Sequence, residues 1–293
     1  MSQRGKMSAD MKILICGLGR MGKVHEKYIK SLNLKYSCYD PYRDDISDSL
    51  RLENITSDTV KEFSHVLIST PEGTHAELYY KFKDLGFYGK FLIEKPVIVN
   101  EKDKDIFLDS SVYSGMVERF NPAVDKLKSL VEVSNIVSMD FVRCSVKGSS
   151  NQRVDSFTDV GIHDIDLYLH ITSQKDISSY QIFQHSNTFS LFGKSESGHL
   201  VRFLWSNETF SKERKIVVRQ TDCTYEANLI EQTVRKFTSS KDPNSQGIVC
   251  QNFYVEKSSS IKNEIENFIS NDGERVSSML SHMLYLDIKK EKK

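Results

Sequence analysis

The sequence lacks the marks of a membrane, secreted or nucleic-acid-binding protein. Its 40 basic and 40 acidic residues cancel, so there is no overall basic field to attract nucleic acid or an anionic membrane surface. No apolar run approaches the length needed to cross a bilayer. The opening MSQRGKMSAD lacks the apolar core of a secretion signal. We therefore predict a polar tail over residues 1–11 and a protein that binds neither nucleic acid nor membrane.

Cysteine is also sparse. The five cysteines form no C-x-x-C motif. Cys16 and Cys38 lie inside apolar, strand-like runs, where cysteine usually behaves as a small hydrophobic residue. This usage predicts a reduced, cytoplasmic protein. A length of 293 residues with 39% hydrophobic content is enough for two domains with sizeable cores.

The first half of the chain alternates between apolar strands and helices. Helical patterns cover about 21–32 and 75–85, and the charged stretch EKDKDIFLDSS predicts a further helix from residue 101. Continuously apolar strands that alternate with helices indicate a parallel sheet covered on both faces. The predicted strands are 12–16, 35–39, 65–69, 90–94 and 112–117.

The pattern changes from about Ile136. Strand-like runs such as IVSMDFVRCSV, TFSLFG and LVRFLW follow one another with one clear helix among them, near 160–172. This arrangement predicts an antiparallel sheet in a second domain of α+β type. The tail from about Ile261 to Lys290 is again helical. We therefore predict an α/β fold with a doubly wound parallel-sheet domain over 1–120 and an α+β domain with a mostly antiparallel open sheet over 121–293.

A glycine-rich turn, GLGRMG, follows the first strand and precedes the first helix. Its three glycines have the G-x-G-x-x-G spacing of a dinucleotide site, in which they allow a tight turn, close approach of the pyrophosphate and close helix–strand packing. The free N–H groups of the helix N-terminus then face the phosphates. The predicted cofactor-binding residues of this turn are Gly17, Leu18, Gly19, Arg20, Met21 and Gly22.

An acidic residue ends the second strand, as the same fold requires. Asp40 lies about twenty residues after the glycines, where a carboxylate holds the adenosine ribose. Its charge disfavours a 2′-phosphate, which predicts NAD as the cofactor. Arg43 nearby leaves NADP as the less favoured alternative.

Two further stretches follow strands at the edge of the sheet where such folds bind ligands. One is STPEGTH, from which we predict cofactor contacts by Ser69, Thr70, Pro71 and His75. The other is Glu94-Lys95-Pro96, in which the ammonium of Lys95 can reach the nicotinamide end of the cofactor. The proline predicts a fixed turn, with a cis bond as one form of it. A solvated lysine at a strand end is the alternative interpretation of Lys95.

The motifs GLGRMGKVH, STPEGTHAEL, FLIEKP and TDVGIHDIDL resemble the glucose–fructose oxidoreductase / inositol dehydrogenase / MocA family of dehydrogenases. Within this family, GMVERFNPAVDKLKSL followed by RVDSFTDVGIHDIDL is most similar to the UDP-N-acetylglucosamine 3-dehydrogenases. The resemblance covers nearly the whole chain. It implies a Rossmann domain, a C-terminal α+β domain whose open sheet makes oligomer contacts, and hydride transfer between a sugar carbon and a nicotinamide.

The resemblance also implies a catalytic set of Lys95, Asp159 and His163. Asp159 and His163 are four residues apart, so they share a face of a helical turn. A histidine titrates near neutrality and suits the general base that removes a hydroxyl proton. A partly desolvated Lys95 can stabilise the developing oxyanion. The sequence leaves open which of Lys95 and His163 accepts the proton.

Other residues have a plain structural interpretation beside the functional one. Arg119 and Asn121 form turns or, by the resemblance, contact substrate together with Asp159 and His163. The HDID run contains metal-ligand types, but no cluster completes a site, so we predict no metal. Lys212 and Arg214 match a basic pair of the family or belong to a solvated strand face. The short polar stretch 146–155 departs from the better-known relatives.

We therefore predict an NAD-dependent dehydrogenase that oxidises a secondary alcohol of a sugar, at C3 of a UDP-N-acetylhexosamine. One alternative is an inositol or other polyol dehydrogenase of the same family. A second is a non-catalytic NAD-binding regulator, which the intact Lys95, Asp159 and His163 disfavour. The resemblance implies a homodimer or homotetramer.

Overall fold

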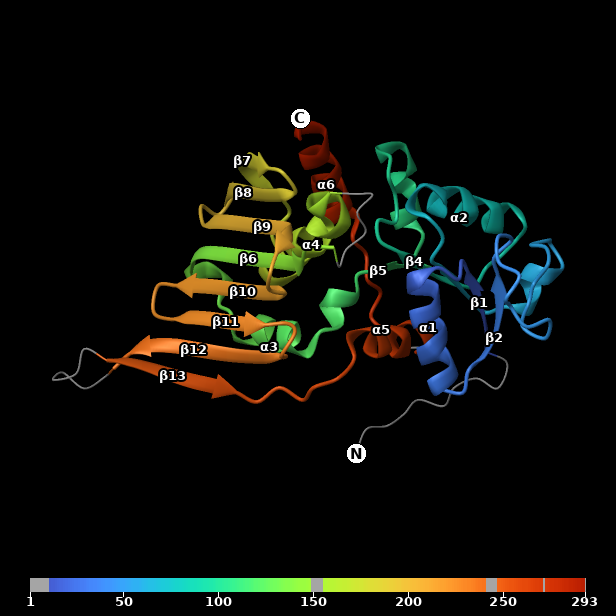
Figure 1. The fold of residues 1–293 in the computed structure, drawn as a ribbon, viewed down its shortest axis with the longest axis horizontal. Helices are drawn as coiled ribbons and strands as arrows, with labels where there is room; N and C mark the ends of the chain where they lie inside the picture. The colour runs from blue at the N-terminus through green and yellow to red at the C-terminus, as the bar shows by residue number, and fades with distance from the viewer. Residues whose placement is uncertain (1–10, 149–154, 241–246, 271, 293) are drawn as a thin grey trace. The chain divides into compact units, whose positions relative to one another are not determined.

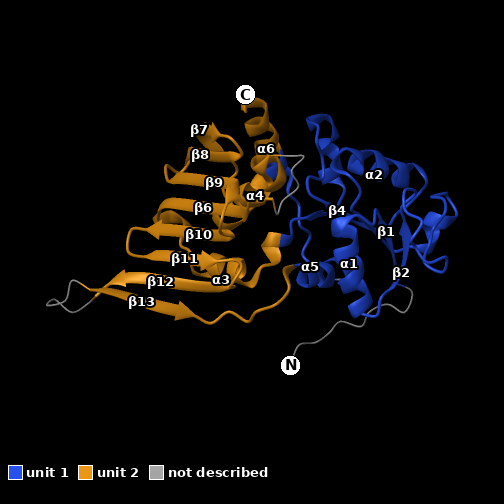
Figure 2. Cartoon of the chain, viewed as in Figure 1, with its two compact units in different colours: residues 1–117, 261–282 blue, residues 118–260, 283–293 orange. Residues whose placement is uncertain are grey.

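The computed structural model describes residues 11–148, 155–240, 247–270 and 272–292. It divides the chain into two compact units, which Figure 2 colours separately. Unit 1 comprises residues 1–117 and 261–282, and unit 2 comprises 118–260 and 283–293. Residues 1–10 of the predicted N-terminal tail and the centre of the 146–155 stretch lie outside the described residues, while Met11 is buried in the core of unit 1. Among those described, no helix is long and apolar enough to cross a membrane.

Unit 1 is built on a five-stranded parallel sheet in the order β2-β1-β3-β4-β5 (Figure 1). The strands are β1 Lys12–Cys16, β2 Lys35–Tyr39, β3 His65–Ile68, β4 Lys90–Glu94 and β5 Val112–Gly115. The helices are α1 Arg20–Ser31, α2 His75–Asp84 and α5 Ser260–Ile269, with short 3₁₀ turns at Thr59–Glu62, Glu72–Thr74 and Glu101–Leu108.

Helices cover both faces of this sheet because its strands are apolar on both sides. On one face, Leu92 and Tyr113 belong to a core that includes Ile29 of α1 and Phe268 of α5. On the other face, the ring of Phe91 meets those of Tyr79 and Phe82, both from α2. The parallel strands bring their carboxyl ends, and the loops that follow them, to one edge.

Unit 2 contains an eight-stranded sheet in the order β13-β12-β11-β10-β6-β9-β8-β7 (Figure 1). All its neighbouring strands are antiparallel except the pair β6 and β9. The strands are β6 Ile136–Val146, β7 Ile177–His185, β8 Thr188–Ser195, β9 Leu200–Thr209, β10 Glu213–Gln220, β11 Thr224–Asn228, β12 Thr233–Ser239 and β13 Ile248–Phe253. The helices are α3 Pro122–Leu130, α4 Ile162–Thr172, entered through a π-helical turn at Phe157–Gly161, and α6 Met279–Glu291, which begins in unit 1.

Apolar and polar side chains alternate along the strands, so one face of this sheet is apolar and buried. In β9, the rings of Phe203 and Trp205 are stacked and fully buried, while Arg202, which precedes Phe203, is exposed. Tyr168 of α4 packs edge-on against Phe203 and Phe141. The opposite face carries Asp140, which pairs with Arg202 and Arg219.

The fold class is the one the sequence predicts, a doubly wound parallel sheet followed by a mostly antiparallel one. The structure divides the chain differently, however. The first unit ends at Val117 rather than at 120, and residues 261–282 return to it, so the predicted domain 121–293 is not one continuous unit. The predicted helix from residue 101 is a 3₁₀ helix, and α3 is a helix that the sequence analysis did not predict.

Candidate functional site

The glycine-rich turn has the backbone geometry that its spacing predicts. Gly17 has φ +87°, and a Cβ there would lie 2.8 Å from the backbone nitrogen of Thr70. A Cβ on Gly22 would lie 1.9 Å from the carbonyl oxygen of Gly17, so only glycine allows α1 to approach this turn so closely. A Cβ on Gly19 would meet nothing within 4 Å. Two glycines therefore shape the turn, and the middle one leaves open space.

The N-terminus of α1 is suited to an anion. Gly19 is its N-cap, no side chain caps it, and its first turn contains no acidic residue. The unpaired N–H groups and the helix dipole therefore favour a negative group at this end. A dinucleotide pyrophosphate fits both the open space at Gly19 and the N–H groups of Arg20, Met21 and Gly22.

Asp40 lies directly after β2, beside the glycine turn. Its carboxylate accepts hydrogen bonds from the backbone N–H of Leu18, at 2.8 Å, and of Tyr42, at 3.1 Å. A carboxylate has about four lone-pair positions, so it can also accept from ribose hydroxyls. Arg43 donates through Nε and Nη2 to Asp45, and its hydrogen bond lowers the pKa of Asp45 to about 2. The one arginine next to Asp40 is thus already paired.

The loop after β3 is held by side chains that bond to the backbone. Ser69 donates its hydroxyl to the carbonyl oxygen of Gly17 at 2.8 Å, which ties this loop to the glycine turn. The ring nitrogens of the buried His75 lie 2.8 Å and 2.9 Å from the carbonyl oxygens of Thr70 and Pro96. Both nitrogens of His75 thus face the backbone, so His75 braces the loops after β3 and β4. Its predicted contact with the cofactor stays a prediction.

Glu94 and Lys95 lie at the carboxyl end of β4. The buried Glu94 bonds to Nε2 of His25 at 2.6 Å and accepts the backbone N–H of Lys95 at 3.2 Å. The Lys95–Pro96 peptide bond is cis. Burial raises the pKa of Glu94, but the hydrogen bond and charge of His25, with Lys95, outweigh it and lower the pKa below its usual value. Glu94 is therefore an anion that anchors the backbone at Lys95.

The remaining catalytic candidates belong to unit 2. Asp159 lies in the π-helical turn before α4, and His163 lies in the first turn of α4. Their elements are consecutive along the chain, as their spacing predicts. Lys95 lies in unit 1.

Arg119 and Asn121 have structural partners in unit 2. Arg119 donates two hydrogen bonds to Asp166, at 2.7 Å and 2.6 Å. Asn121 is buried and caps α3 by accepting the N–H of Ala123, while its amide donates to the carbonyl oxygen of Leu229. Asn121 thus has a capping role, because both polar ends of its side chain bond to the backbone, and its predicted substrate contact stays a prediction.

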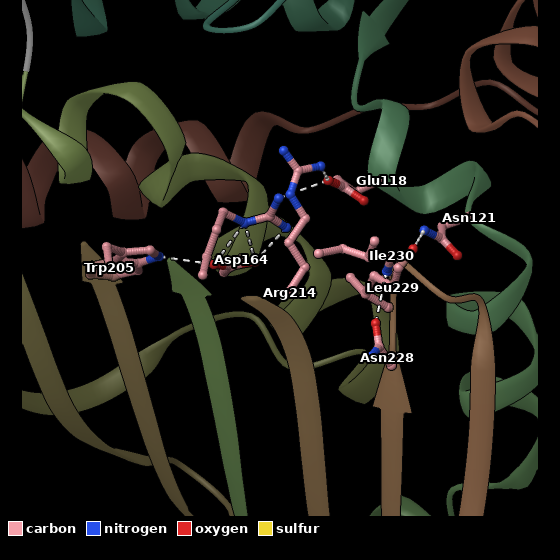
Figure 3. A network of polar contacts seen from close by, with 9 residues as sticks. Glu118, Asn121, Asp164, Trp205, Arg214, Asn228, Leu229 and Ile230 are labelled. Atoms are coloured by element: carbon pink, nitrogen blue, oxygen red, sulfur yellow. Dashed lines mark hydrogen bonds and ion pairs between the residues drawn. The ribbon is translucent and has the colours of Figure 1, made fainter. Parts of the chain in front are cut away.

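A buried ionic network that the sequence analysis did not predict lies nearby in unit 2 (Figure 3). Arg143 of β6 donates to Asp164 of α4 at 2.8 Å and to Glu118 at 2.7 Å. The indole N–H of Trp205 donates to Asp164, and Arg214 donates to Glu118. Burial lowers the pKa of the Arg143 guanidinium, but Asp164 and Glu118 raise it more, so it remains charged.

Arg214 connects this network to a catalytic candidate. Burial and then the charge of Arg143 lower the pKa of Arg214, while Glu118, Asp164 and Asp159 act in the opposite direction. The guanidinium therefore lies within the electrostatic reach of Asp159. Figure 3 shows it bonded to Glu118. The signal in the sequence was a charged residue, Arg143, in the apolar strand IVSMDFVRCSV.

No group of three or more histidine, cysteine or acidic side chains that could hold a metal ion occurs among the described residues. Several titratable groups are paired instead, as Glu94 is with His25, Arg119 with Asp166 and Arg143 with Asp164. The fold and the glycine turn together define a class of protein, one with a dinucleotide-binding parallel-sheet unit joined to an α+β unit.

Comparisons with known proteins agree with this class. No family model matches the sequence. A UDP-N-acetylglucosamine 3-dehydrogenase from Acidithiobacillus ferrooxidans superposes with a TM-score of 0.83 at 17% identity, covering 96% of each chain. A dehydrogenase from Clostridium difficile superposes with a TM-score of 0.77 at 14% identity, covering 96% of this chain and 99% of that one. These structures show that the fold is shared.

A myo-inositol 2-dehydrogenase from Thermotoga maritima is 25% identical over 191 residues. The match spans 56% of this chain and 56% of that relative. The chain therefore matches about half of the relative's length. The resemblance to the glucose–fructose oxidoreductase / inositol dehydrogenase / MocA dehydrogenases is thereby confirmed, and the chain has their two-part fold.

Proposed function

We propose that this protein is an NAD-dependent oxidoreductase that oxidises a secondary alcohol of a sugar. The observation that carries the proposal is the glycine turn, in which Gly17 and Gly22 allow close packing and the N-terminus of α1 is left uncapped. Such a terminus binds a pyrophosphate without further residues. The shared fold of the sugar-nucleotide and inositol dehydrogenases supports the same conclusion.

The cofactor is held by backbone groups of residues 17–22 and by Asp40, whose carboxylate accepts the ribose hydroxyls. When bound, the nicotinamide supplies the acceptor for the hydride that leaves the sugar carbon. Because Asp40 is an anion and Arg43 is paired with Asp45, NAD should bind more tightly than NADP. Thr70, Pro71 and Lys95, which follow β3 and β4, are the residues that we propose to contact the nicotinamide end.

Lys95 and His163 act on the hydroxyl group that loses its proton in the reaction. Lys95 stabilises the developing oxyanion by a hydrogen bond from its ammonium group. Either Lys95 or His163 accepts the proton as hydride leaves, and Asp159, four residues before His163, orients the imidazole. Asp159 is also among the carboxyl groups whose charge raises the pKa of Arg214 against the effect of its burial.

The substrate we favour is UDP-N-acetylglucosamine, oxidised at C3, because the structure superposes over 96% of its length on an enzyme named for that reaction. A polyol such as myo-inositol is the second candidate, favoured by the relative from Thermotoga maritima. Incubation with NAD and each compound, followed by nicotinamide reduction and product mass, distinguishes them. Competitive inhibition by UDP supports the nucleotide sugar. Oxidation of inositol with no effect of UDP supports the polyol, and reduction with neither contradicts the proposal.

We also propose that the chain forms a homodimer or homotetramer through the open face of the unit 2 sheet. This face carries the exposed rings of Phe183 and Phe192, which contact each other, and the exposed Leu200. Exposed apolar groups gathered on one sheet face favour association. Light scattering on the purified protein and on a Phe183→Asp variant tests this, and a parent protein that is monomeric contradicts it.

A further inference from the structure

Glu264 in α5 is a buried carboxyl group for which the described part of the chain supplies no hydrogen-bond partner. It is 1% exposed, and neither of its oxygens has a hydrogen-bond partner among the described residues. A buried, unpaired carboxyl group destabilises a fold, and an apolar side chain of similar size would not. Its presence therefore calls for a role other than stability.

The surroundings of Glu264 lead to the end of β4. Its neighbours Ile265 and Phe268 pack in the same core as Leu92 of β4 and Ile29 of α1. Glu94 lies two residues after Leu92 in the strand, so its side chain points to the same face. There it bonds to His25 of α1 at 2.6 Å. Two helices thus present a histidine and a second carboxyl group to Glu94.

The pKa values of the two carboxyl groups are shifted in opposite directions. Burial and then the negative charge of Glu94 raise the pKa of Glu264 well above its usual value. The pKa of Glu94 is lowered, because His25 and Lys95 outweigh the effect of burial. Two interacting carboxyl groups separated in this way hold a single proton between them over a wide pH range. In that range Glu94 is the anion and Glu264 is the neutral acid.

We propose that Glu264 is a positioning residue for the reaction, which acts on Lys95 through Glu94. As a neutral acid it leaves one negative charge at the end of β4, and that charge holds His25 and the backbone N–H of Lys95. If Glu264 lost its proton, two buried anions would repel each other and the anchor at Lys95 would loosen. This inference rests on the proposed function, in which Lys95 contacts the reacting oxygen.

Three other charged or titratable groups lie on the elements around Glu94 and Glu264. His25 reaches Glu94 from α1, and Lys95 follows Glu94 in the chain. Lys90 lies on the same face of β4, but it is four residues away, about 13 Å along a strand. Its ammonium group bonds to the carbonyl oxygen of Ser270. Among these groups, Glu264 is the one whose ionisation would place a second anion beside Glu94 as the pH rises.

The test compares the parent with Glu264→Gln and Glu264→Met, which are neutral at every pH and differ in polarity. Glu266→Gln, an exposed change on the same helix, is the matched control. The kcat with NAD and UDP-N-acetylglucosamine, or with myo-inositol if that is oxidised instead, is measured against pH. We expect the alkaline loss of kcat to move upward by at least about one pH unit in both Glu264 variants, because a tenfold change in ionisation is one unit. The control should keep the parent profile.

Thermal unfolding gives a second readout that needs no substrate. A carboxyl group whose pKa is raised by folding destabilises the fold increasingly as the pH rises above its unfolded value of about 4.3. Glu264→Gln and Glu264→Met should therefore unfold at least about 3 °C above the parent at pH 8, with the difference disappearing near pH 4. The sole tryptophan, Trp205, reports on unit 2, so circular dichroism is used to follow unit 1 as well.

Each outcome decides the inference. An alkaline limb that is identical in the parent and both variants shows that Glu264 does not act through Lys95. A Tm difference that does not depend on pH shows that Glu264 is not held as the neutral acid, and also overturns the inference. If the parent oxidises no sugar, the proposed function fails, and so does a positioning role in it. A pH-dependent Tm difference would then still establish the shared proton.

Discussion

The two units bury charge in opposite ways. In unit 2, Arg143 is surrounded by two carboxylates, and Trp205 satisfies one of them, so the charges compensate each other. In unit 1, Glu264 and Nδ1 of His25 are buried without hydrogen-bond partners among the described residues. A complete network stabilises the arrangement that it joins, whereas an incomplete one costs stability. The comparison indicates that the paired charges around Arg143 stabilise unit 2, whereas the unpartnered atoms of Glu264 and His25 lower the stability of unit 1.

The largest effect should come from Lys95 in unit 1. Lys95→Met keeps the length and the apolar stem but removes the charge, so we expect kcat to fall by about 10²–10⁴-fold with little change in NAD affinity. Thermal unfolding should change little. Steady-state kinetics and an NAD titration measure the two effects.

Lys90→Met, the same change at the other end of β4, is the control for Lys95→Met. His163→Ala should reduce kcat by a comparable factor, and the double variant should lose less than the product of the two, because groups that act as one unit are not additive. A Lys95→Met protein that binds NAD and turns over sugar at nearly the parent rate would make Lys95 a structural lysine.

Substitution of Arg143 in unit 2 should lower the stability of the fold, whereas substitution of Lys95 should lower kcat. Arg143→Met leaves Asp164 and part of the charge of Glu118 buried without compensation, which costs about 3–5 kcal/mol. Urea unfolding followed by the fluorescence of Trp205, the sole tryptophan, reports on this unit. Arg219→Met, which removes an exposed partner of Asp140 on the same sheet, should cost less than about 1 kcal/mol. Equal losses in the two variants would contradict the difference between buried and exposed pairs.

Much of unit 1 can be predicted from sequence because its signals are local. Each strand of its sheet is a short apolar run, and the glycine turn and Asp40 follow such runs directly. Helix α3 also has local signals, with Asn121 as its N-cap and Pro122 at its first position. They were interpreted as a turn at a domain boundary, and the helix was missed.

The features that could not be predicted from sequence depend on contacts between residues that are distant in the chain. The return of α5 to unit 1 is decided by packing on Leu92 and Tyr113, which its own pattern does not encode. Arg143 meets Glu118 and Asp164 across 25 and 21 residues of sequence. The pairing of a buried charge cannot be inferred from the strand that carries it. For the same reason, the roles of His25 and Glu264 became visible only in the structure.

A third prediction concerns pH and a buried histidine of unit 1. Burial, and then Lys90, lower the pKa of His65 to about 4. A histidine whose pKa is lowered by folding binds fewer protons in the folded state, so stability is complete above the unfolded pKa of about 6.5 and declines as the pH falls towards 4. The loss reaches up to about 3 kcal/mol on that scale. His65→Gln should flatten this acid limb in urea unfolding followed by circular dichroism. His185→Gln, at an exposed position of unit 2, should leave it unchanged. An acid limb that persists in His65→Gln would assign it to other groups.

The smallest effect should come from the exposed ion pair beside the cofactor site, where Arg43 is held by Asp45. Asp45→Asn keeps the shape but removes the charge, so it should release Arg43 towards a 2′-phosphate next to Asp40 without changing the thermal unfolding. Exposed pairs are weak because water and salt screen them, so the affinity for NADP relative to NAD should rise by only roughly two- to fivefold. Titration of both dinucleotides measures this ratio, and the double variant with Arg43→Met should return it to the parent value or below. If Asp45→Asn leaves the ratio unchanged, Arg43 does not reach the ribose, and the preference for NAD depends on Asp40 alone.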